Sequence, residues 1–227
     1  MRHLTAAAVA AVAALATPAF AAPSWSYFAG GDAAFLAISN NGMLERAVAE
    51  GRIGDAGTNQ TWEIALWERG GVGAPKDQDN LTITNGTVMP WTLTWDGVNT
   101  VSYTVNGVLV SWNQVAGNFT DIFIRSRSAT DSMVVVQSID LVGSGLAIGD
   151  LSSSGNGDVD YLRIQNMGMD FPALTLTGNL TLSWTGARPS NSQLATQIKL
   201  TNVIPAPGGV ALGLVALGAG ARRRRRR

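Results

Sequence analysis

Alternating hydrophobic and polar residues dominate the middle of the chain and predict β-strands. Trp91, Leu93 and Trp95 fall on one side of an extended chain, whereas Thr92 and Thr94 fall on the other. Successive side chains of a strand point to opposite faces, so this period of two is typical of a sheet with one buried face. We expect the apolar side of each such strand to face a core and the threonine side to face water.

Turn dipeptides connect this strand to its neighbours. Asp96-Gly97 and Asn106-Gly107 are pairs that favour two-residue hairpin turns, and they predict a three-stranded meander. The strands of this meander are expected at 88–95, 100–105 and 108–112, and an Asn85-Gly86 hairpin is expected to add a strand at 81–84.

The same alternation predicts further strands and very little helix. A short helix is predicted at 41–50, with Asn41 as its cap and Gly51 at its end, and a strand is the alternative there. Many short strands with Gly and Asn turns predict an all-β fold, a β-sandwich of jelly-roll type. The further strands are expected at 24–28, 33–38, from 58 to 66, and at 119–125, 133–142, 160–164, 174–184 and 196–202.

The start of the chain has the pattern of a secretory signal peptide. Arg2 and His3 are basic, residues 4–16 are apolar, and Ala19 and Ala21 form a small-x-small cleavage site. Residues 1–21 are therefore expected to form a signal helix that is removed after Ala21. The exported domain would comprise residues 22–202.

The last 25 residues read as a separate tail. Pro205 and Pro207 would stop a helix or central strand, so the folded domain is expected to end before them. Residues 210–221 are apolar and predict a short helix, which is shorter than the roughly 20 residues of a full membrane span and suits a transient stop. A block of basic residues then follows, which would keep this end in the cytoplasm; a basic tail that binds nucleic acid or anionic lipid is the alternative. The block comprises Arg222, Arg223, Arg224, Arg225, Arg226 and Arg227.

The order of these parts resembles the PEP-CTERM sorting signal. Pro205, Ala206, Pro207 and Gly208 correspond to its short motif, residues 210–221 to its apolar segment, and the arginines to its basic end. The usual motif is Pro-Glu-Pro, so this tail is similar to a Pro-Ala-Pro variant, and the departure bears on which exosortase subtype would accept it. The resemblance implies that an exosortase processes residues 203–227 while the secretion machinery places the protein on the cell surface.

The exported domain resembles the choice-of-anchor domains more loosely. The similarity lies in Trp95-Asp96-Gly97 and in Gln197-Ile198-Lys199. It implies a β domain at the cell surface in front of an anchoring tail.

Composition narrows the chemistry that is available. The exported part carries nine basic and 16 acidic residues, a net charge of −7, which argues against nucleic acid as a partner and is compatible with divalent cations. The chain has no cysteine, and its one histidine, His3, lies in the signal peptide. A thiol nucleophile, a Ser-His-Asp triad and a histidine zinc site are thereby excluded from the exported protein.

One stretch could carry hydrolase chemistry. Glu63 and Glu68 resemble the paired carboxylates of family 16 glycoside hydrolases, which lie on one bulged strand of a jelly roll, but Ala65 replaces the intervening Asp. A retaining mechanism needs the two carboxyls about 5 Å apart. The alternative is that the glutamates face solvent or pair with Arg69.

Between residues 150 and 160 the chain is rich in oxygen ligands. Asp150, Ser152, Ser154, Asp158 and Asp160 could bind calcium, which takes six to eight oxygens. The closing Glu of an EF-hand loop is replaced by Tyr161, so a solvated turn is the alternative. No other cofactor is expected.

The tryptophans fall on different sides of the predicted strands. Five lie beside aliphatic residues and are expected in the core, because aromatic side chains dominate buried area. Trp67 has the opposite parity to Trp62 and is the best candidate for an exposed, sugar-stacking platform, and a tryptophan packed under a loop is the alternative. The five core candidates are Trp62, Trp91, Trp95, Trp112 and Trp184.

Together these patterns predict an exported, exosortase-processed protein of the cell envelope or extracellular matrix. We expect a structural or interaction role without enzymatic activity and transient anchoring in the membrane through the tail. The alternative is a carbohydrate-binding module with a polysaccharide partner, and a retaining glycoside hydrolase comes third. An exposed row of aromatic side chains would favour the binding module, and a close Glu63–Glu68 pair in a cleft would favour the hydrolase.

Overall fold

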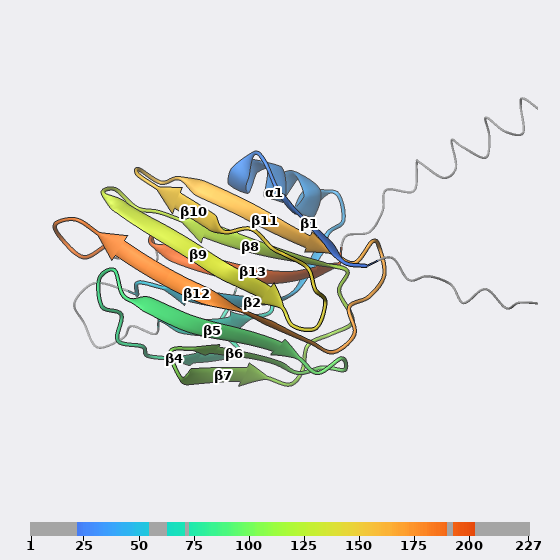
Figure 1. The fold of residues 1–227 in the computed structure, drawn as a ribbon. Coiled ribbons are helices and arrows are strands. Elements are labelled where there is room, and N and C mark those ends of the chain that lie inside the picture. Colours follow the sequence, from blue (N-terminus) through green and yellow to red (C-terminus); the bar gives the residue numbers. More distant parts are fainter. Residues whose placement is uncertain (1–21, 55–62, 71–72, 190–192, 203–227) are drawn as a thin grey trace, which may run out of the picture.

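Two antiparallel sheets pack face to face as a β-sandwich in the computed structural model of the chain (Figure 1). The structure describes residues 22–54, 63–70, 73–189 and 193–202. The seven-stranded sheet contains, in spatial order, β1 (Ser24–Tyr27), β11 (Val159–Gln165), β8 (Asp121–Arg127), β13 (Ala195–Asn202), β2 (Leu44–Arg52), β3 (Ile64–Trp67) and β4 (Asp77–Asp79). The six-stranded sheet contains β10 (Leu151–Ser154), β9 (Ser132–Leu141), β12 (Leu174–Trp184), β5 (Val88–Trp95), β6 (Val101–Val105) and β7 (Val108–Trp112).

The predicted meander and its alternation are confirmed. Trp91, Leu93 and Trp95 of β5 are buried between the sheets, whereas Thr92 and Thr94 are half-buried on the outer face. Both sheets contribute to one contiguous core, as expected when the inner faces of a sandwich interdigitate. Of the five predicted core tryptophans, Trp62 lies outside the described residues and the other four contribute to this core: Trp91, Trp95 and Trp112 buried, and Trp184 packed against them.

The one helix of the described chain, α1 (Gly31–Asn40), lies where the sequence predicted a strand at 33–38. Gly30 adopts φ 96°, a conformation that favours glycine, and turns the chain from β1 into the helix. Asp32 stands in the first turn, where a carboxylate is favoured by the helix dipole. The prediction was wrong because α1 buries chiefly Phe35 against the sheet, so its apolar residues do not form the wide stripe that identifies a helix.

The predicted helix at 41–50 is also wrong, because this segment forms strand β2. β2 lies inside the seven-stranded sheet between β13 and β3. Residues 47–51 are buried without alternation, since the core covers one face and outer side chains cover the other. A strand buried on both faces has no period of two for sequence analysis to detect.

Two smaller differences from the predicted strands remain, and the strand predicted at 174–184 is confirmed as β12. Residues 81–84 form no strand, although Gly86 does make a turn with φ 72° before β5. Strands β4 and β10 are short and were not predicted. β12 runs unbroken through Gly178, where the register shifts and the ring of Trp91 lies against the backbone.

Both described ends of the chain lie at one end of the sandwich. Ser24 pairs with Gln165, Gln165 with Asp121, and Asp121 with Thr201, so these four residues form one row across β1, β11, β8 and β13. We call this the terminal end, and the opposite end of the sandwich the far end. The predicted signal helix, residues 1–21, and the predicted apolar helix, 210–221, lie outside the described residues. Among the residues that are described, no helix is long and apolar enough to cross a membrane.

Candidate functional site

The turn between β5 and β6 at the terminal end is fixed by one carboxylate. One oxygen of Asp96 accepts the backbone N–H groups of Val98, Asn99 and Thr100 at 2.8, 2.9 and 3.0 Å. These bonds, that from Thr100 above all, lower the pKa of Asp96 to about 2. The turn therefore keeps a fixed shape at neutral pH.

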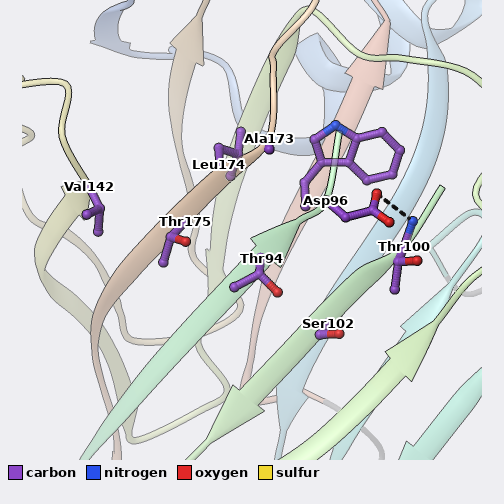
Figure 2. A pocket seen from close by; sticks show the side chains of 9 residues that line it. Thr94, Asp96, Thr100, Ser102, Val142, Ala173, Leu174 and Thr175 are labelled. Carbon is purple, nitrogen blue, oxygen red and sulfur yellow. Dashed lines mark hydrogen bonds between the residues drawn. The ribbon is translucent and has the colours of Figure 1, made fainter. Parts of the chain in front are cut away.

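A cleft of about 500 Å³ opens beside this turn, on the outer face of the six-stranded sheet (Figure 2). Its polar wall is made of hydroxyl groups from Thr94, Thr100, Ser102 and Thr175 together with Asp96. Hydroxyls can both donate and accept hydrogen bonds, so this wall suits a neutral, hydroxyl-rich ligand. The apolar wall consists of Trp95, Val142, Ala173 and Leu174.

A second cavity of about 720 Å³ adjoins the cleft at the terminal end and shares three of its residues, Val142, Ala173 and Leu174. Its walls are mainly apolar, and Phe171 and Met169 contribute from the loop that follows β11. This loop is tied to the chain end, because Phe171 N–H bonds to Phe119 O and Thr120 N–H bonds to Thr201 O. The other lining residues are Ala22, Pro23, Leu141, Gly143, Ser144, Asn166, Asp170 and Pro172.

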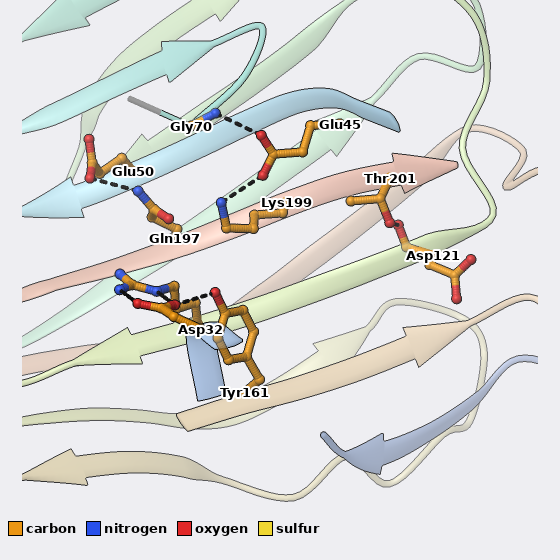
Figure 3. Close-up of polar contacts among 10 residues, drawn as sticks. Asp32, Glu45, Glu50, Gly70, Asp121, Tyr161, Gln197, Lys199 and Thr201 are labelled. Carbon is orange, nitrogen blue, oxygen red and sulfur yellow. Dashed lines mark hydrogen bonds and ion pairs between the residues drawn. The ribbon is translucent and has the colours of Figure 1, made fainter. Parts of the chain in front are cut away.

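The outer face of the seven-stranded sheet instead carries charged side chains beneath α1 (Figure 3). Arg125 of β8 donates two hydrogen bonds to Asp32 of α1, at 2.7 and 2.6 Å, and the Tyr161 hydroxyl donates a third at 2.7 Å. Burial raises the pKa of Asp32, but the bonds from Arg125 and Tyr161 outweigh it and the net pKa is lowered. Above this group, Phe35 stacks on Tyr161 with ring centroids 5.2 Å apart.

A second ion pair on the same face joins β13 to β2. Lys199 Nζ lies 2.7 Å from one oxygen of Glu45, and the other oxygen accepts the N–H of Gly70 at 2.9 Å. The same ammonium lies 4.9 Å from the ring centre of Phe35. With all these groups in contact, the ion pair joins two strands, one loop and the helix.

The expected exposed platform at Trp67 is wrong. Trp67 is only 7% exposed and packs with Val48 and Ala65 on the outer face of the seven-stranded sheet. Its indole N–H donates to Glu50 at 3.2 Å, and Gln197 donates to the other Glu50 oxygen at 2.9 Å. Trp67 does lie on the outer face of its sheet, as its position in the alternation indicated. It is nevertheless buried, because neighbouring side chains cover this part of the outer face.

The close Glu63–Glu68 pair that a hydrolase would need is not formed. β3 pairs with β2 in regular register without a bulge, so nothing brings the two carboxylates to the same side. Glu63 is buried and accepts the N–H of Leu81 at 3.0 Å, whereas the Glu68 side chain is 56% exposed and pairs with Lys76 at 3.0 Å. The geometry that a retaining hydrolase would require is not formed by these residues.

The predicted calcium ligands do not converge. Asp150 precedes β10 and accepts the N–H of Ser138, whereas Asp158 lies beyond the other end of β10 and accepts the N–H of Ser154. Four extended residues separate those ends by about 13 Å. Ser152 is exposed on β10, and Asp160 belongs to the other sheet. In the described part of the chain, no three Asp, Glu, His or Cys side chains gather into a metal site.

The remaining predicted sites, those for sorting and processing, lie outside the described residues. They are Ala19 and Ala21 for signal cleavage, Pro205, Ala206, Pro207 and Gly208 for the motif, and residues 222–227 for the basic block. No protein-family model matches the chain, and no curated protein matches it.

The candidate surface that sequence reasoning missed is the pair of cavities at the terminal end. Their walls come from three separate turns and loops, and only Asp96-Gly97 among them carried a recognisable signal, that of a turn. Hydroxyl and apolar side chains line the cleft, and mainly apolar side chains line the second cavity. This arrangement can hold a ligand or a surface by non-covalent contact.

Proposed function

We propose that the chain is an exported protein of the cell surface or extracellular matrix, displayed through its C-terminal tail, with a β-sandwich that acts by binding and not by catalysis. The observation that supports this proposal best is the position of both described ends at the terminal end. A tail that leaves from Asn202 would hold the sandwich by that end. The far end would then point away from the cell.

The sequence of the tail supports sorting by an exosortase. Residues 203–209 contain the Pro-Ala-Pro motif and separate Asn202 from the apolar run by seven residues, which reach at most about 25 Å. An apolar run held in the bilayer would therefore keep the terminal end close to it. We also propose that the sandwich is of the jelly-roll type. The proposed route to the surface requires that the secretion machinery exports the chain.

Cell fractionation tests this function. We expect the wild type in the envelope fraction and accessible to external protease, and a chain truncated after Asn202 in the medium. A matched variant with all six terminal arginines replaced by lysine keeps the charge and is expected to remain in the envelope. If wild type and truncated chains fractionate alike, the proposal fails.

Carbohydrate binding is the second candidate, and the hydroxyl-lined cleft of about 500 Å³ favours it. The triple variant Thr94→Val, Ser102→Ala, Thr175→Val removes three of its four hydroxyls, leaving Thr100, without removing volume from the core. In affinity electrophoresis on soluble polysaccharides, we expect this variant to lose at least tenfold in affinity. Thr181→Val, on the same sheet but away from the cleft, is the control. Failure of the wild type to bind any polysaccharide tested would eliminate this candidate.

A further inference from the structure

Three turns at the terminal end expose large apolar side chains at their tips. Val98, in the turn between β5 and β6, is 70% exposed; Val142, after β9, is 54% exposed; and Met167, after β11, is 58% exposed. Each is adjacent in sequence to a glycine with positive φ, so each stands on a tight turn. These glycines are Gly97, Gly143 and Gly168, respectively. Exposed valine and methionine at three neighbouring turn tips form an apolar edge that the fold itself does not bury.

These three tips surround the two cavities already described. Val142 lines both of them, and Asp96 and Thr100, which flank Val98 in its turn, line the first. Asn166 and Met169, which flank Met167, line the second. The tips and the apolar cavity between them therefore form one surface, which we call the apolar rim.

The far end differs in the composition of its turns. The turn tips described there are Asn85-Gly86, Asn106-Gly107, Thr130-Asp131, Gly155-Asn156-Gly157 and Thr185-Gly186, all exposed and all polar or glycine. The exposed apolar side chains near the far end, Val88 (50%), Leu109 (57%) and Met133 (40%), lie on strands β5, β7 and β9, whereas Val98, Val142 and Met167 stand on turns at the terminal end. The terminal end is the end at which Asn202 lies.

We infer that the apolar rim contacts the outer surface of a lipid bilayer, with Val98, Val142 and Met167 entering the boundary between headgroups and acyl chains. This inference rests on the proposed function, because the tail provides the reason for a membrane at this end. Residues 203–209 span at most about 25 Å before the apolar run begins, so a run in the bilayer brings the rim within reach of the lipid.

The charge at this end selects the lipid. Asp96 and Asp170 are exposed beside the rim and would repel anionic headgroups. We therefore expect contact with zwitterionic lipid. Apolar side chains inserted a few ångströms at an interface hold a surface weakly, and the tail supplies the remaining attachment.

A fluorescence experiment on the chain that keeps its tail, residues 22–227, tests the inference. Because the chain has no cysteine, a single introduced cysteine can be labelled with an environment-sensitive dye. Val98→Cys and Val142→Cys report on the rim, Thr185→Cys reports on the far end, and Leu214→Cys reports on the tail. Each labelled chain is mixed with phosphatidylcholine vesicles, with and without a nitroxide quencher on the acyl chains.

We expect a blue shift and acyl-chain quenching at positions 98, 142 and 214, and an aqueous signal at 185. If position 214 is quenched while 98 and 142 behave like 185, the rim inference fails and the anchoring tail stands. If position 214 stays aqueous together with 98 and 142, both fail. A shift at 98 and 142 that needs no vesicles and grows with protein concentration would assign the rim to a second copy of the chain and overturn the inference.

Discussion

The two outer faces of the sandwich use their polar residues differently. On the seven-stranded sheet, charged side chains lie under α1 and hold one another, as in the Arg125–Asp32 and Lys199–Glu45 pairs. On the six-stranded sheet, most of the outer side chains of β5, β6 and β12 are half-exposed neutral hydroxyls, with Val88 and Pro90 exposed at the start of β5. The one helix of the described chain packs on the charged face.

This difference indicates which face is available for binding. Buried charges need partners, and the partners here are other parts of the same domain, so the charged face contributes to the fold. The hydroxyls on the uncovered face are neutral and accessible to a ligand, although Ser102 and Ser111 also bond each other at 2.8 Å. The charged side chains are thus less available to a ligand than the hydroxyls. Substitutions on each face in turn should separate the contribution to stability from the contribution to binding.

The largest effect is expected at the buried ion pair. Lys199→Met leaves Glu45 charged and buried without its partner, and breaking a buried pair in this way costs about 3–5 kcal/mol of unfolding free energy. Urea denaturation of the mature chain measures the loss.

A paired variant serves as the control. Lys199→Met with Glu45→Gln removes both charges, and the glutamine oxygen can still accept the N–H of Gly70. We expect it to recover most of the loss. Equal destabilisation in single and double variants would mean that the packing of Lys199, and not its charge, maintains this face.

The aromatic anchor of α1 comes next. Phe35 is 5% exposed and contacts Phe123 and Tyr161, so Phe35→Ala should lower the unfolding free energy by about 3 kcal/mol and speed hydrogen exchange in α1. Leu36→Ala, at a position that is 57% exposed, is the matched control and should change stability by less than about 0.5 kcal/mol. Unchanged exchange in α1 after Phe35→Ala would contradict the anchoring role.

A smaller, pH-dependent effect is expected at Asp32. Its pKa in the folded protein is lower than its ordinary value of 3.8, so its ionised form contributes stability above that value, and the contribution is lost as pH falls through the folded pKa. Because the side chain is 46% exposed, we expect Asp32→Asn to cost only about 1 kcal/mol at pH 7. The difference from wild type should shrink toward pH 2, and a difference independent of pH would contradict the assignment.

The smallest effect is expected on the uncovered face. Thr92 and Thr177 lie opposite each other on β5 and β12, and both are half-exposed. Thr92→Val with Thr177→Val keeps β-branched residues and should alter stability by less than about 0.5 kcal/mol. A loss well above 1 kcal/mol in thermal unfolding would show that this face is packed and not free.

The sequence predicted the strands that have one buried and one open face. The alternation in β5 and the Asn106-Gly107 turn identified the meander, because both signals are local. β2 was missed because its central residues are buried on both faces, and α1 because it buries chiefly one side chain, Phe35.

The candidate sites depended more on distant contacts. Trp67 looks exposed by parity, but it is buried and its indole N–H donates to Glu50, 17 residues away, which also accepts a bond from Gln197 of β13. Asp32 and Tyr161 are 129 residues apart and meet only because α1 folds over β11. No short-range pattern records such contacts, so these predictions needed the fold.

Mass spectrometry of the protein released from the cell surface tests the central claim most directly. We predict a species that begins at Ala22 and ends between Pro205 and Gly209, without the arginine block. Surface-exposed protein that still carries residues 222–227 would contradict processing by an exosortase and, with it, the proposed route by which the sandwich is displayed.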